Sequence, residues 1–133
     1  MRAEELLDAL LHLDQLGPAV RAAAIYPGSG EPVFRPRAGT DRRAAADGEY
    51  WEEAVINPTL LDLCRRCGAA RHEGFDYLMV RYADGWLLML PFGRGHVSVA
   101  FEATGDPIAA VGAVRALCER HGLAHVESSW DRA

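Results

Sequence analysis

Two cysteines separated by two arginines, Cys64 and Cys67, form a motif whose residue types and spacing suggest chemistry. Thiolates at this spacing supply half of a zinc site, which then needs two further ligands. His72 and Cys118 are the candidates, so one hypothesis is a metal site that uses Cys64, Cys67 and Cys118. A redox pair is a second hypothesis, although a helix C-terminus does not stabilise a thiolate. The interpretation we favour is that these thiols face the core as small hydrophobic groups.

A histidine and a serine, His96 and Ser98, lie two positions apart on a predicted strand and so share one face. Their backbone positions are about 6.6 Å apart, which is too far for a direct hydrogen bond unless the side chains lean together. Gly28-Ser29-Gly30 resembles a phosphate-binding loop, but a strand follows it, and no helix N-terminus is offered to an anion. The sequence therefore predicts no catalytic residue, no cofactor and no enzyme activity.

The composition indicates one soluble domain rather than a nucleic-acid or membrane protein. The chain has 133 residues and a net charge of −5, which argues against nucleic acid as the main partner. It has no lysine, so a Schiff-base lysine and a P-loop lysine are both excluded. The acidic residues among the first leucines exclude a signal peptide, and no apolar run approaches the roughly 18 residues of a membrane span. Three cysteines do not suggest a secreted disulfide framework, so we expect a cytoplasmic protein.

The residues above need a scaffold, and the stretch 76–101 predicts its centre, a meander of three antiparallel strands. The strands are expected at Tyr77–Tyr82, Trp86–Phe92 and His96–Phe101. Asp84-Gly85 predicts the first turn as a two-residue type I′ loop, and Gly93–Gly95 predicts the second as a three-residue loop.

The two turns together predict which side chains share a face, because directly opposed residues point to the same side of a sheet. Val80 is expected opposite Met89, and Met89 opposite Val99. A one-residue slip in either turn would scatter this set. The opposite face is also apolar near Leu88 and Leu90, so we expect something to cover both faces. The full set expected on one face is Leu78, Val80, Tyr82, Leu87, Met89, Val97, Val99 and Phe101.

The rest of the chain predicts two further strands and three helices around this meander. Asn57-Pro58 is expected to interrupt helical character, because the residue before proline avoids the α region. The order becomes α-β-β-α-β-β-β-α, an α+β fold with a five-stranded antiparallel sheet and helices on both faces. We expect one domain over residues 1–133, with a core of about 4–122 and a tail at 123–133. The predicted elements are a helix at Arg2–Leu16, strands at Val20–Tyr26 and Glu31–Arg35, a helix at Pro58–Cys67 ending at Gly68, and a helix from Asp106-Pro107 to Gly122.

The order of elements, with Tyr77–Tyr82, the run from Asp84 to Pro91 and the strand at Gly95–Phe101, resembles the roadblock/dynein light chain family, whose fold is profilin-like. The helix that begins at Asp106-Pro107 fits the same pattern. Pro58 departs from it, because it falls where the family has an unbroken helix. The resemblance implies that the first and last helices cover one face of the sheet and the middle helix the other.

The resemblance also implies a non-enzymatic homodimer that acts with a small Ras-like GTPase or another signalling partner. The middle helices would pack together, and the third-strand edges would pair. One alternative is a small-molecule sensor of PAS- or profilin-like architecture, with a pocket beside Trp86 or Trp51; the metal-binding protein is another. Nucleic acid and membranes are not expected as partners. The expected interface residues are Leu60, Leu61, Cys64, Tyr77, Met79 and Arg81.

Overall fold

The computed structural model of the chain describes residues 3–13, 20–37, 50–104 and 106–123. Within them the elements follow the predicted order, α-β-β-α-β-β-β-α, with two short non-α turns of helix added. The helical elements are α1 (Ala3–Leu11), the π-helical η2 (Glu52–Ile56), α3 (Asn57–Arg71), the 3-10 turn η3 (Pro107–Ala110) and α4 (Val111–Arg120). The strands are β1 (Val20–Tyr26), β2 (Val33–Pro36), β3 (Leu78–Tyr82), β4 (Gly85–Phe92) and β5 (Gly95–Glu102).

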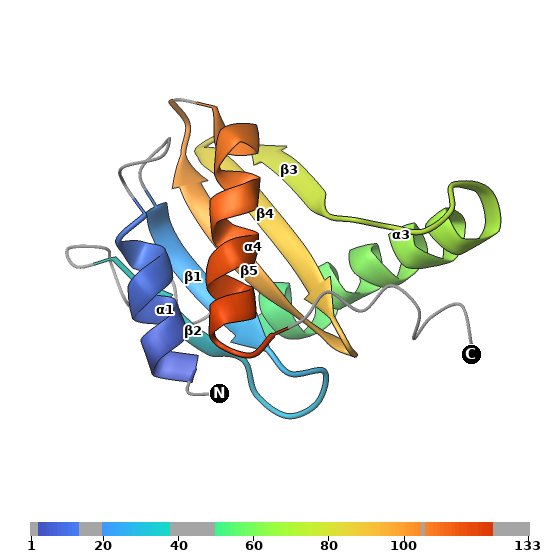
Figure 1. The fold of residues 1–133 in the computed structure, drawn as a ribbon, viewed down its shortest axis with the longest axis horizontal. Helices are drawn as coiled ribbons and strands as arrows, with labels where there is room; N and C mark the ends of the chain where they lie inside the picture. The colour runs from blue at the N-terminus through green and yellow to red at the C-terminus, as the bar shows by residue number, and fades with distance from the viewer. Residues whose placement is uncertain (1–2, 14–19, 38–49, 105, 124–133) are drawn as a thin grey trace.

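All five strands pair antiparallel in one sheet, in the order β2-β1-β5-β4-β3. Figure 1 shows α1 and α4 in front of the sheet and α3 behind it. The predicted α+β fold class, with helices on both faces, is confirmed. The two edges of the sheet are its two shortest strands, β2 with 4 residues and β3 with 5.

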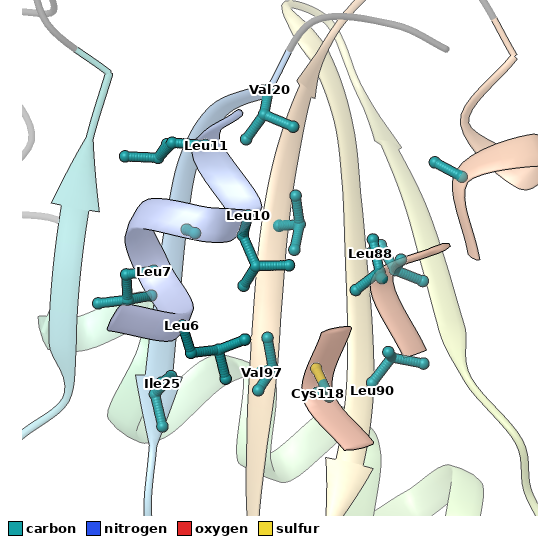
Figure 2. Packing of buried hydrophobic residues seen from close by; sticks show 14 of the residues in the cluster. Leu6, Leu7, Leu10, Leu11, Val20, Ile25, Leu88, Leu90, Val97 and Cys118 are labelled. Carbon is teal, nitrogen blue, oxygen red and sulfur yellow. The ribbon is translucent and has the colours of Figure 1, made fainter. Parts of the chain in front are cut away.

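The face beneath α1 and α4 holds the main hydrophobic core. Four leucines of α1 are buried there, because they recur at helical spacing along one side of the helix. They pack against β1, β4, β5 and α4 (Figure 2). Burying each such side chain contributes about 1.5–3 kcal/mol. The residues of this core that Figure 2 labels are Leu6, Leu7, Leu10, Leu11, Val20, Ile25, Leu88, Leu90, Val97 and Cys118.

The first turn of the meander lies one residue earlier than predicted. Tyr82 pairs with Gly85 and Val80 with Leu87, so the loop is Ala83-Asp84. Neither loop residue has a positive φ, so the loop is not of type I′. This change moves the pairing by two residues, and the residues predicted to share a face within β3 and β4 therefore still do so.

The second turn is shorter than predicted, and this changes the faces. Phe92 pairs with Gly95, and Leu88, rather than Met89, pairs with Val99. Met89 and Val99 therefore point to opposite faces, and the prediction that one face carries both is wrong. Gly95 is a residue of β5, and it must be glycine because the β1 backbone passes close beside it. A Cβ there would lie 2.0 Å from the Tyr26 carbonyl oxygen. Gly85 has the same role, since its Cβ would lie 2.2 Å from the Phe101 carbonyl oxygen.

The middle helix also continues where the sequence predicts a break. Asn57 keeps α-helical dihedral angles before Pro58, and its N–H donates to the Glu52 carbonyl, five residues back. Because Pro58 lies in the first turn of α3, its missing N–H removes no bond that an α-helix needs. The helix also runs past Gly68 to Arg71. A Cβ at Gly68 would lie 2.5 Å from the Gly74 carbonyl oxygen, so this glycine lets the returning chain pack against α3.

The remaining boundaries agree in part. The last helix begins as predicted, with the Asp106 carboxylate accepting a hydrogen bond from the Ile108 N–H at 3.0 Å. Gly122, with φ 87°, ends it. The α-helix at the N-terminus ends at Leu11, and the part of the prediction from residue 14 onward lies outside the described residues, as does most of the predicted tail.

Candidate functional site

A buried carboxylate attaches the middle helical segment to the sheet. Glu53 of η2 is 4% exposed, and its Oε2 lies 2.7 Å from His96 Nε2. Ser98 Oγ donates to Glu53 Oε1, also over 2.7 Å. His96 and Ser98 are adjacent on one face of β5, as the sequence predicts, and both are fully buried. The carboxylate therefore bridges the two side chains that strand spacing alone would leave apart.

This cluster lacks the geometry of a nucleophilic site. A serine nucleophile needs its hydroxyl bonded to a histidine base, with the base oriented by a third group. Here Ser98 donates to Glu53, and His96 also bonds to Glu53, so serine and histidine are two arms of one carboxylate. All three side chains are sealed from solvent. The arrangement can fix η2 on β5, but it presents no reactive group to a substrate.

Two further polar residues lie on the inner side of α3. Asn57 is completely buried, and neither its Oδ1 nor its Nδ2 makes a hydrogen bond within the described part of the chain. Leaving buried polar groups unpaired costs about 1–3 kcal/mol. Arg65 is buried too, and Nη2 donates to the Gly95 carbonyl over 3.5 Å. Burial lowers the pKa of Arg65 to about 10, against an opposing effect of Asp62, so the guanidinium remains charged at neutral pH.

The outer side of the same segment carries exposed apolar side chains. Of the large apolar residues that are exposed in the described part of the chain, most lie between residues 50 and 63. Trp51 and Leu63 are each 60% exposed. Single exposed apolar residues are ordinary, but a group of them along one element marks an interaction surface. We call this group the outer flank: Tyr50, Trp51, Val55, Ile56 and Leu63.

The segment that carries the outer flank continues into a helix that passes an unpaired sheet edge. Figure 1 shows α3 running behind the sheet and projecting past β3, and a long connection from its far end returns the chain to that strand. β3 is the last strand of the sheet and pairs only with β4 among the described strands. An open edge offers unpaired backbone groups to another strand.

The residues predicted for an interface fall into three groups. Leu60 and Cys64 are partly buried along α3, whereas Leu61 is 2% exposed and packs on Leu87 and Met89. The other predicted residues lie in β3 or just before it, away from α3. Tyr77 and Met79 pack against the core beneath α1 and α4, and Arg81 lies over the Trp86 ring at 5.2 Å.

Sequence reasoning missed the exposed members of this surface and the carboxylate behind it. Trp51, Val55 and Leu63 are exposed, yet a pattern search selects apolar residues for the inside of a helix. Glu53 precedes Asn57 and Leu61 at a four-residue spacing, which places all three on one side of a helix. That spacing, together with the His96-x-Ser98 pair on a strand, is the sequence signal that could have found the buried cluster.

The cysteines do not form the three-residue site considered above. Cys118 is buried on the inner side of α4, whereas Cys64 and Cys67 lie on α3, behind the opposite face of the sheet (Figures 1 and 2). Within the described part of the chain no three metal-ligating side chains come together. Burial, with a smaller effect of Cys67, raises the pKa of Cys64, and burial raises the pKa of Cys118 to about 11. Both thiols therefore favour the protonated form, which binds metal poorly.

The Gly28-Ser29-Gly30 stretch, which resembles a phosphate-binding loop in sequence, is a turn between β1 and β2, with φ of 102° at Gly28 and 77° at Gly30. Among the described helices, none is both long enough and apolar enough to cross a bilayer.

The layered arrangement of a five-stranded antiparallel sheet, with α1 and α4 on one face and the middle helix on the other, is that of the roadblock/LC7 fold. Two solved structures show it. The chain superposes on a Roadblock/LC7 domain from Streptomyces avermitilis with a TM-score of 0.66 and 16% identity, covering 90% of this chain and 94% of that one. It superposes on MglC from Myxococcus xanthus with a TM-score of 0.57 and 14% identity, covering 90% and 96%. The resemblance predicted from the sequence is confirmed at the level of the fold.

No protein-family model matches the chain, and no curated protein matches it.

Proposed function

We propose that this chain is a non-enzymatic, homodimeric interaction module that acts with a small Ras-like GTPase or a related signalling protein. The proposal rests on two observations: the η2–α3 segment carries the outer flank, and α3 projects past the unpaired edge strand β3. The roadblock/LC7 fold supports the proposal by analogy.

The dimer would form by joining the two β3 edges and packing the two α3 helices beside each other. Pairing of β3 with its copy would satisfy the backbone groups that the edge exposes. A two-fold axis beside β3 would bring α3, which carries Leu63, against the α3 of the partner. The outer flank would thereby be removed from water, which is the main favourable term in most protein association.

Action on a GTPase would rest on surface complementarity rather than on chemistry. The polar cluster of Glu53, His96 and Ser98 is sealed from solvent and bonded within itself. A dimer that binds one conformation of the switch loops better than another shifts the GTPase toward it.

The dimer is tested by light scattering across a concentration series. Leu63→Arg is expected to raise the dissociation constant at least tenfold, because a charge would replace an apolar contact at the two-fold axis. Ile108→Arg is the matched control, since Ile108 is also exposed, at 52%, but lies in η3, which leads into α4 on the other face of the sheet. A wild-type chain that stays monomeric at high micromolar concentration would refute the dimer, as would equal effects of the two substitutions.

The partner is tested separately, by titrating purified small GTPases, loaded with GDP or with a GTP analogue, against the wild-type chain and Leu63→Arg. Binding that distinguishes the two nucleotide states supports the proposal. A dimer that binds no GTPase in either state would leave the interaction module without the partner proposed for it.

A small-molecule sensor is less well supported. Its pocket was expected beside Trp86 or Trp51, but Trp51 is 60% exposed and Trp86 packs against the core. The sheet face beneath α1 and α4 is filled by side chains such as Leu10, Leu88 and Val99, each 0% exposed.

A further inference from the structure

The π-helical turn η2 is attached to the sheet without buried apolar side chains of its own. Its five residues, Glu52–Ile56, bury one side chain, and that side chain is the Glu53 carboxylate. Val55 and Ile56, the larger apolar residues of the turn, are exposed. The two bonds from Glu53 to His96 and Ser98 are therefore the buried attachment of η2 to the sheet.

The next inward position opposes this attachment. Asn57 follows Glu53 by one turn of helix, and its amide is completely buried without a hydrogen bond in the described part of the chain. Water would satisfy both polar atoms if the segment opened, so Asn57 favours opening while Glu53 favours closing. Leu61, one turn further on, is the first apolar side chain that the segment buries.

We propose that Glu53 is a latch: its bonds hold η2 and the start of α3 on β5, and their loss releases residues 50–61 from the sheet while the rest of the fold stays intact. Local opening of this kind is expected where few apolar contacts hold an element. A π-turn within a helix is also frequently found at functional sites. The released segment carries most of the outer flank, so the latch would decide whether that surface is presented in a fixed position.

The latch is tested by amide hydrogen exchange on the wild type, three variants of the segment and one control variant. Glu53→Met keeps an unbranched side chain but leaves His96 and Ser98 without their acceptor. We expect exchange in residues 52–61 to rise at least tenfold, while β1 and β5 keep their protection. The glutamine of Glu53→Gln can still accept a hydrogen bond from one partner and donate one to the other. The exchange rate of this variant should therefore fall between those of the wild type and Glu53→Met.

Asn57→Leu makes the opposite test, since leucine has the same branching and the same number of heavy atoms as asparagine. It removes the unpaired amide, and exchange in residues 52–61 should slow about threefold or more. Val114→Ala is the control, because Val114 is buried on the inner side of α4, over the other face of the sheet. Loss of its side chain should speed exchange in all elements together.

The proposal is overturned if Glu53→Met leaves exchange in residues 52–61 unchanged, or if it speeds exchange in every element, as Val114→Ala does. Should Glu53→Met not fold, Ser98→Ala removes one of the two bonds, and the same comparison decides. Exchange is measured at concentrations where the chain is monomeric, so the latch can fail or succeed whether or not the proposed dimer exists. Its effect on the outer flank rests on the proposed function and is read from the dissociation constant of Glu53→Gln.

Discussion

The helices on the two faces of the sheet bury different kinds of side chain. α1 turns four leucines inward, and they join the apolar side chains of β1, β4, β5 and α4. The longer η2–α3 segment turns mostly polar groups inward and leaves apolar groups outside. A helix held by leucines detaches only when the fold is lost, whereas a helix held by a few polar bonds can detach alone. The buried residues of the second segment are Glu53, Asn57, Leu61, Arg65 and Gly68.

The largest expected difference between the faces comes from one substitution made on each. Leu10→Ala should lower the free energy of unfolding by about 4 kcal/mol and Leu61→Ala by about 2.5 kcal/mol, because fewer apolar neighbours surround Leu61. Urea denaturation of both variants measures this. An equal loss of unfolding free energy in Leu61→Ala would show that both faces are held alike, and a larger loss would reverse the comparison.

A second comparison uses the pH dependence of stability that the buried Cys118 thiol of α4 should produce. Below pH 9 Cys118 is protonated in the folded and the unfolded chain, but between 9 and about 11 only the unfolded chain releases the proton. Stability should therefore fall as pH rises through this window, by at most about 2.7 kcal/mol for a shift from 9.0 to about 11.

The measurement is the difference in unfolding free energy between wild type and Cys118→Val across pH 8 to 11. The valine variant has no thiol to titrate, so other groups that titrate in this range, such as Arg65, contribute equally to both proteins. A difference that does not change with pH would show that the hydrophobic core does not shield the Cys118 thiol from water.

The smallest expected effect concerns an ion pair between α4 and the connection that follows α3. Arg115 of α4 bonds to Asp76, which lies on the connection between α3 and β3. Both side chains are partly exposed, so Arg115→Gln should cost only about 0.2–1 kcal/mol in thermal or urea unfolding. Arg66→Gln, which breaks a 3.1 Å pair with Asp62 within α3, is the control. A loss of unfolding free energy in Arg115→Gln well above this range, and above that of Arg66→Gln, would mean that this ion pair makes a major contribution to holding the layers together.

The fold could be predicted from the sequence because element order and apolar content suffice to define it. The register of the meander could not, since both faces of β4 are apolar. Leu87 and Met89 face α3 while Leu88 and Leu90 face α4, so a one-residue slip leaves no trace in the hydrophobic pattern.

Two local signals misled the prediction for physical reasons. Gly85 and Gly95 indicate turns by composition, yet they are strand residues whose missing Cβ admits a neighbouring carbonyl. Asn57-Pro58 indicates a helix break, yet a π-turn with a bond from Asn57 to Glu52 carries the helix through. In each case a long-range contact or an unusual hydrogen-bond pattern overrides a local preference.

Because α3 projects past β3, a small change in its tilt moves its far end over a longer distance. Its 15 residues span about 22 Å, at 1.5 Å per residue. A tilt of about 10° at the η2 end would carry the Arg71 end through an arc of about 4 Å, which is most of one helical turn. A shift of side-chain size at the start of α3 would thus become a larger displacement at its Arg71 end.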